Sequence, residues 1–120
     1  MGQAVKLELH ADGTRCRPGD ALTGSVLVPE GGEVRSLRVV LNFREHTEDY
    51  DDKRQVAETH LHAGSVLPGQ RFPFTMQVSA DALPTLYSTH GELSWELEAH
   101  ADVRGFDARH AVSVAVLPGS

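Results

Sequence analysis

The sequence predicts an all-β protein, an immunoglobulin-like antiparallel β-sandwich of about seven strands. Apolar and polar residues alternate with a period of two through most of the chain, which is the pattern of strands that bury one face. An amphipathic helix would instead need apolar residues spaced by three and four. Eleven glycines and six prolines fall mostly between the alternating segments, where they favour turns. Seven such segments are typical of two antiparallel sheets packed face to face.

Alternating apolar and polar residues predict the first four strands, and turn residues separate these strands from one another. A Pro-Gly-Asp turn at residues 17–20 separates the first two strands, and Gly31-Gly32 separates the second from the third. The acidic stretch Glu48–Lys53 then breaks the pattern, so we expect it to be the tip of a hairpin between the third and fourth strands. The seven predicted strands cover residues 5–10, 22–28, 37–44, 57–63, 72–78, 93–103 and 112–116.

The last three strands are separated by one turn and one long connection. Pro and Gly at residues 67–70 favour a tight turn before the fifth strand. Residues 79–91 contain a proline and no alternation, so we expect a connection with one helical turn at residues 81–83. Gly105 divides the final two strands. Trp95 lies among the inward residues of the sixth strand, and we predict that it is the central anchor of the core.

Length and charge narrow the class of protein. We expect residues 1–120 to form a single domain, since this length suffices for one core. A net charge of −6 argues against nucleic acid and anionic membranes as partners, because both attract basic surfaces. No apolar stretch approaches the ~20 residues of a membrane span, and the first thirty residues carry no targeting signal. The sequence therefore predicts a cytoplasmic protein without membrane insertion.

Three stretches resemble the amino-terminal domain of arrestin-like proteins. The first, residues 17–26, is Arg-Pro-Gly-Asp-Ala-Leu-Thr-Gly-Ser-Val, and the second, residues 34–41, is Val-Arg-Ser-Leu-Arg-Val-Val-Leu. The third and most specific consists of Leu67-Pro68-Gly69, Phe72-Pro73-Phe74, Leu83-Pro84 and His90-Gly91-Glu92-Leu93-Ser94-Trp95-Glu96-Leu97-Glu98-Ala99. This order of motifs is similar to eukaryotic arrestin domains and to the bacterial sporulation-control proteins of the same superfamily.

The resemblance implies a single arrestin-like β-sandwich that serves as a scaffold or adaptor for other proteins in a bacterial cytoplasm. It implies no enzymatic activity, catalytic residue or cofactor. Arrestins contain two such sandwiches, whereas 120 residues have room for one. Only Lys6 is basic on the first strand, which lacks the lysine pair of visual arrestins, so phosphate sensing is not expected. The identity of the protein partner does not follow from the sequence.

The alternative interpretation is a small metal-binding β-sandwich that uses surface histidines. Glu58, His60 and His62 are spaced by two, so a regular strand would place all three on one face. Imidazole and carboxylate groups are ligands for zinc or copper. The sequence nevertheless favours a solvated polar face over a metal site, for a reason that lies in the neighbouring strand.

The predicted register of the hairpin argues against that metal site. Pairing Phe43 with Ala57 keeps both apolar faces inward and places Arg38 opposite His62. An arginine beside a proposed ligand repels a cation, and the neighbouring strand supplies no third histidine. We therefore assign no metal ligand, cofactor site or catalytic residue.

Three other groups of residues suggest chemistry but have simpler explanations. Glu48–Asp52 offers the oxygen ligands that calcium takes, but it lacks the spacing and central glycine of an EF-hand loop. Ser88 is close to His90 in sequence, but no orienting carboxylate is evident. The single cysteine, Cys16, lies between two arginines that favour a lowered thiol pKa. We interpret these as a solvated hairpin tip, a loop and an incidental loop cysteine.

Strand edges and loops are the expected means of binding. An unpaired edge strand can accept a partner strand through backbone hydrogen bonds. The partner strand would come from another protein or from a second copy of the chain, which would make a homo-oligomer. Lys6, Glu8, Lys53 and Arg54 are charged residues that we expect to protect such edges from unspecific pairing.

Overall fold

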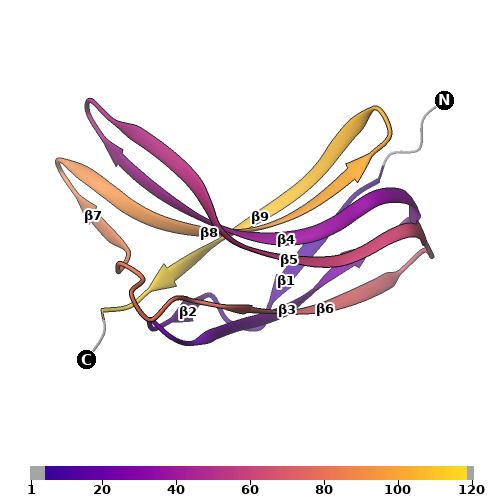
Figure 1. Ribbon diagram of the computed structural model, residues 1–120, viewed down its shortest axis with the longest axis horizontal. Helices are drawn as coiled ribbons and strands as arrows, with labels where there is room; N and C mark the ends of the chain where they lie inside the picture. Colours follow the sequence, from indigo (N-terminus) through magenta and orange to yellow (C-terminus); the bar gives the residue numbers. More distant parts are fainter. Residues whose placement is uncertain (1–4, 119–120) are drawn as a thin grey trace.

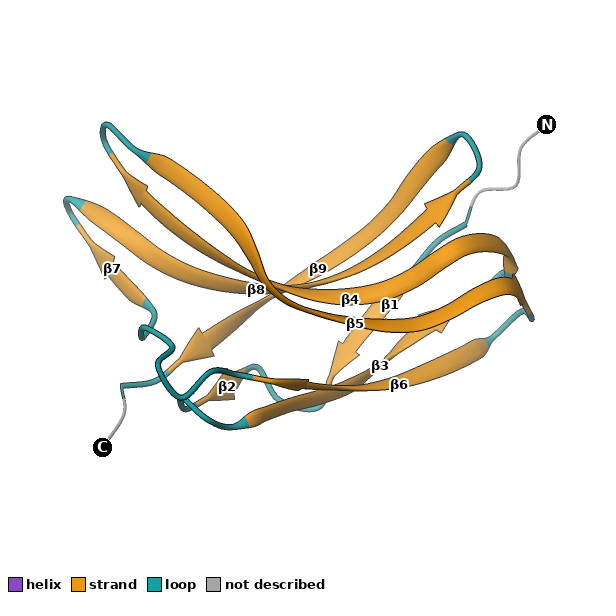
Figure 2. Cartoon of the chain, viewed as in Figure 1, coloured by secondary structure: helices purple, strands orange, loops and turns teal. Residues whose placement is uncertain are grey.

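The computed structural model describes residues 5–118, and within them nine strands and no helix are found (Figures 1 and 2). The strands are β1 (Glu8–Ala11), β2 (Arg15–Cys16), β3 (Ala21–Val28), β4 (Gly32–Thr47), β5 (Asp51–Val66), β6 (Gln70–Gln77), β7 (Leu86–Ser88), β8 (Gly91–Val103) and β9 (Phe106–Val116). The order β1-β3-β6 forms a small sheet, and β2-β9-β8-β4-β5 forms a large sheet, to which β7 adds beside β8. The predicted all-β sandwich is confirmed. No helix in residues 5–118 is long and apolar enough to cross a membrane.

The short strands β2 and β7 were not predicted, and the predicted helical turn at residues 81–83 is absent. The strand β2 pairs with β9 in parallel, so the large sheet is mixed rather than purely antiparallel. The expected helical turn at residues 81–83 is wrong, because the connection makes only one hydrogen-bonded turn, from Ala82 N to Ser79 O. Pro84 disfavours helical geometry at the residue before it. The chain then extends into β7, which pairs with the start of β8.

The core lies between the two sheets and is built from the inward half of each alternating pattern. Its largest fully buried side chains come from both sheets and from the residue that follows β6. They are Val26, Val28, Leu37, Val39, Leu41, Val78, Leu97 and Val116. Gly24 allows the close approach of β1, since a Cβ at this position would collide with the carbonyl of His10. At the edge where β1 meets β9, the Leu9 amide donates to His110 Nδ1 at 2.8 Å.

Trp95 anchors the core at the point where the connection between β6 and β7, residues 78–85, crosses the large sheet. Its side chain is 7% exposed, and its ring packs at a tilt against Phe43 with 4.7 Å between centroids. The indole Nε1–H donates to the carbonyl of Leu83 at 2.8 Å. A buried indole needs such a partner, so this bond satisfies Trp95 and fixes the connection to the sheet. The prediction that Trp95 belongs to the core is confirmed, and its role as the central anchor stays a prediction.

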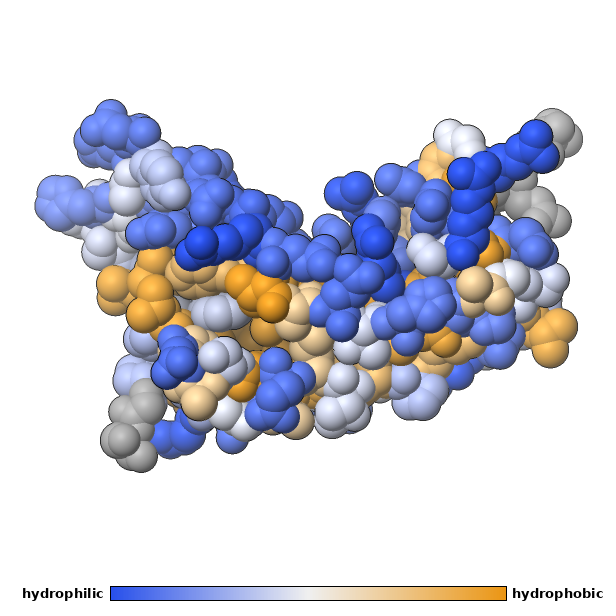
Figure 3. Space-filling model, viewed as in Figure 1, coloured by the Kyte–Doolittle hydropathy of each residue, from blue (hydrophilic) through white to orange (hydrophobic). Residues whose placement is uncertain are grey.

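The strands of the large sheet extend past the small sheet as two arms (Figure 1). The left arm carries the β4–β5 tip together with β7 and the start of β8, and the right arm carries the β8–β9 tip. The outward face of the large sheet between them is hollow, and we call it the trough (Figure 3). Beneath the left arm, the connection of residues 78–85 closes the sandwich (Figure 2).

Replacing Trp95 with Ala should lower the free energy of unfolding by about 3–5 kcal/mol, because the change leaves a large cavity. Trp95→Phe should cost clearly less, since it keeps an aromatic ring against Phe43 and loses the indole donor together with only part of the buried ring. Urea unfolding followed by circular dichroism measures both. A loss below about 1 kcal/mol for Trp95→Ala, the size of an ordinary substitution, would contradict the anchoring role.

Candidate functional site

The β4–β5 hairpin has a different register from the predicted one. Leu41, not Phe43, lies opposite Ala57, and Phe43 lies opposite Arg54. Between these pairs, Val56 is an extra residue that has no direct partner on β4, which makes a β-bulge. Alternation fixes which face a residue takes but does not reveal an inserted residue. The bulge brings Val56 to the same side as Phe43, where both line one groove.

A second bulge separates the two histidines of the proposed metal site. Arg38 pairs with His60 and Leu37 pairs with His62, so Leu61 between the two histidines is unpaired. Leu61 packs against the core, and the His62 ring also turns inward, with its centroid 5.0 Å from that of Phe72. His60 remains on the outward face beside Arg38. The prediction that Glu58, His60 and His62 share one face is therefore wrong, and residues 5–118 contain no group of three or more side chains placed to hold a metal.

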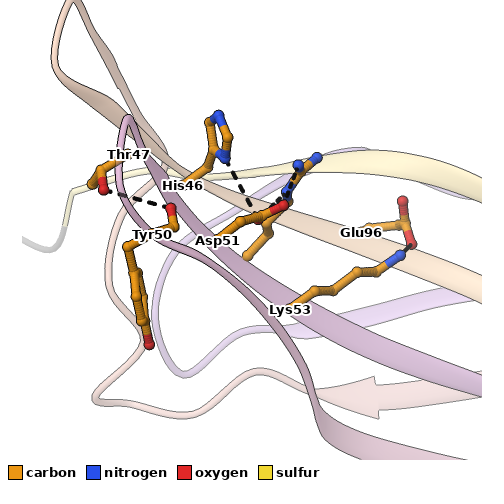
Figure 4. Close-up of polar contacts among 7 residues, drawn as sticks. His46, Thr47, Tyr50, Asp51, Lys53 and Glu96 are labelled. Carbon is orange, nitrogen blue, oxygen red and sulfur yellow. Dashed lines mark hydrogen bonds and ion pairs between the residues drawn. The ribbon is translucent and has the colours of Figure 1, made fainter.

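The acidic hairpin tip is tied into an ion-pair network (Figure 4). Arg44 donates from Nε and Nη2 to the two carboxylate oxygens of Asp51, both at 2.9 Å, and His46 Nδ1 lies 3.6 Å from Asp51. The hydrogen bonds from Arg44, followed by its charge, hold the pKa of Asp51 below its ordinary value. Lys53 and Glu96 form a separate pair at 3.0 Å. Asp51 is thus engaged by an arginine rather than arranged for calcium.

The candidate nucleophiles have structural roles. Ser88 Oγ donates to the Gly91 carbonyl at 3.1 Å and accepts from the His90 amide at 3.3 Å, which stabilises the turn between β7 and β8. Cys16 lies on β2 and is buried. Burial, and then the charge of Asp20, raise the pKa of its thiol, which is opposite to the sequence-based expectation. Neither group is arranged for nucleophilic catalysis.

Three of the four charged residues expected to protect sheet edges lie on outer strands. Glu8 lies on β1, the outer strand of the small sheet, and Lys53 and Arg54 lie on β5, the outer strand of the large sheet. Lys6 precedes β1. The bulges at Val56 and Leu61 further distort the β5 edge, and bulges and charges both oppose strand addition.

The trough is a polar surface whose side chains pair with one another. Glu58 lies 3.9 Å from Arg38, and Asp107 lies 3.5 Å from His100. Arg38 Nε and His100 Nε2 have no hydrogen-bond partner among the described residues, but both atoms are inaccessible to solvent. An incoming ligand therefore cannot reach them directly. Glu58 and His60 are exposed, as the predicted solvated polar face requires, whereas Val40, Asn42 and His100 of the large sheet are buried.

A groove beneath the left arm is the strongest candidate for a functional site. Its upper wall is β5, with Arg54 and Val56, and its lower wall is the connection of residues 78–85, with Asp81 and Leu83. The paired rings of Phe43 and Trp95 form its floor. Because Trp95 also bonds to the Leu83 carbonyl, the floor holds the lower wall in place.

Exposed apolar side chains gather around this groove. Val56, Leu83 and Leu86 are 47%, 53% and 54% exposed. Leu86 pairs with Leu93, which packs on the core, so Leu86 continues the same inward-facing surface. Figure 3 shows this apolar surface below the left arm. Contiguous exposed apolar surface is uncommon on soluble monomers and marks sites of interaction.

The two walls carry opposite charges. Arg54 lies over the Phe43 ring, 6.0 Å from its centroid, and its side chain is 64% exposed, with Asp52 at 3.9 Å. Asp81 is exposed on the lower wall. The groove thus combines an aromatic floor, aliphatic walls and one charge of each sign. The sequence contains one signal of this site. Leu83 and Leu86 are apolar residues on either side of Pro84, in a segment that shows no strand alternation.

Comparison with known proteins establishes the fold. No family model matches the chain, and no curated protein matches its sequence. Among solved structures, the crystal structure of Spo0M, a sporulation control protein from Bacillus subtilis, is similar with a TM-score of 0.78 over 96% of this chain. The sequence identity is 17%, and the chain covers 50% of the length of that structure. The chain has the arrestin-like β-sandwich fold that its motifs predicted.

Replacing Arg44 with Gln should raise the pKa of Asp51 toward its ordinary value of 3.8. Because the native pKa is lowered, the ion pair stabilises the fold above the unfolded pKa and loses this effect as pH falls through the native pKa. NMR titration of the Asp51 carboxyl measures the shift. Arg104→Gln, at the tip of the right arm, is the control and should leave Asp51 unchanged. An Asp51 titration that is the same in all three proteins would refute the assignment.

Proposed function

We propose that this protein is a non-enzymatic interaction module of the arrestin-like type, and that it binds protein through the groove beneath the left arm. One observation carries the proposal: exposed Val56 and Leu83 flank a floor of packed aromatic rings, with an arginine at the rim. Aromatic and arginine residues are enriched among the side chains that dominate protein interfaces. The position of Cys16 and the role of Ser88 in a turn agree with a protein that acts by binding.

The groove is suited to binding because it is already formed. The indole bond to Leu83 fixes the lower wall, and the ladder with β4 fixes the upper wall. A preformed site loses little conformational entropy when it is occupied. A partner that covers one large apolar side chain here gains roughly 1.5–3 kcal/mol from burial. Arg54 can also donate to a carbonyl or carboxylate of the partner from its place over Phe43.

The likeness to a sporulation control protein from a bacterium supports a regulatory role, which we place in the cytoplasm as part of the proposal. In such a role the module would bring proteins together rather than transform a substrate. Fold similarity is general support, because one fold serves many functions. The groove is therefore the part of the proposal to be tested.

Leu83→Asp should weaken partner binding at least tenfold, or about 1.4 kcal/mol, because it places a charge on the apolar wall. Leu67→Asp is the matched control, since Leu67 is also exposed but lies in the turn between β5 and β6. Each protein would be immobilised, and proteins captured from its native host would be quantified by mass spectrometry and then tested in purified form. Equal binding by both variants, with unchanged melting temperatures, would overturn the proposal.

A further inference from the structure

The charges on the groove walls have the arrangement that a symmetric pair of molecules requires. Arg54 lies on the upper wall and Asp81 on the lower wall. When two copies face each other across a two-fold axis that runs along the groove, the upper wall of each copy meets the lower wall of the other. Each Arg54 then faces an Asp81 of the other copy, so the contact forms twice.

The apolar surface is self-complementary under the same rotation. Val56 and Leu83 exchange walls between the copies, as the charges do. Isologous contacts of this kind are the commonest way in which soluble chains associate. The groove floor is nearly buried, because Phe43 and Trp95 are 4% and 7% exposed. A shallow floor suits the broad face of another folded domain more than a deeply inserted side chain.

Pairing of strand edges, the alternative route to self-association, is disfavoured at the two outer strands β5 and β6. The outer strand β5 has bulges at Val56 and Leu61 and charged residues at its start. The outer strand β6 contains Pro73, which has no amide proton to donate. These features oppose the regular ladder that edge pairing needs, whereas they leave the groove face open.

We propose that the occupant of the groove is a second copy of this chain, in a two-fold dimer held by reciprocal Arg54–Asp81 pairs around the apolar walls. This inference rests on the proposed function, since it names the partner of the same groove. The proposed dimer requires two ion pairs, each between residue 54 of one copy and residue 81 of the other.

Sedimentation velocity of the full chain over a wide concentration range tests the dimer. The wild type should shift from monomer to dimer as concentration rises. Arg54→Asp and Asp81→Arg should each weaken the dimer at least tenfold, because each places like charges together twice. An equimolar mixture of the two variants should restore it, since both contacts in the mixed dimer then join an aspartate to an arginine. The double variant should also dimerise, whereas Leu67→Asp should behave as the wild type.

A strictly monomeric wild type, or a mixture that behaves as the separate variants do, would overturn the dimer. The two proposals can fail separately. Suppose that the wild type is monomeric and captures another protein, and that Leu83→Asp no longer captures it. The docking function then stands, and the second copy is the wrong occupant. If Leu83→Asp alters neither dimerisation nor capture, the groove is not an interaction site. Circular dichroism of each variant confirms that the fold is retained.

Discussion

The indole of Trp95 is the group on which both the fold and the candidate site depend. Its ring fills the space against Phe43, and its N–H holds the connection between β6 and β7 through the Leu83 carbonyl. Without this bond, residues 78–85 would still be held to β9 at Thr85, but the lower wall of the groove would lose its link to the floor at Leu83. One side chain therefore links core packing to the shape of an exposed surface.

The placement of apolar residues explains why binding is expected beneath the left arm and not in the trough. Charged side chains of the trough lie beside opposite charges, for example Lys53 of β5 beside Glu96 of β8, on the far side of β4. Beneath the arm, Val56, Leu83 and Leu86 remain half exposed. Covering such side chains releases ordered water and is favourable. In the proposed dimer, the apolar surface beneath the arm supplies the energy of association.

Much of the fold could be predicted from the sequence because alternation is a local property. Residues around Leu41 and Leu97 show a period of two, and both are fully buried on the inner face of the large sheet. The bulges at Val56 and Leu61 could not be predicted, since an unpaired residue depends on how two strands meet. The predicted face of His62 was wrong because the unpaired Leu61 precedes it. The groove was also missed, because its lower wall belongs to a connection with no periodic pattern.

The indole N–H signal of Trp95 in NMR spectra tests the central claim most directly, because Trp95 is the single tryptophan and lies at the groove floor. The account predicts slow hydrogen exchange at this N–H in the dilute protein and a change in its chemical shift as concentration rises, while the amide of Leu67 stays constant. Rapid exchange and a shift that is independent of concentration would contradict both the anchoring bond and the occupied groove.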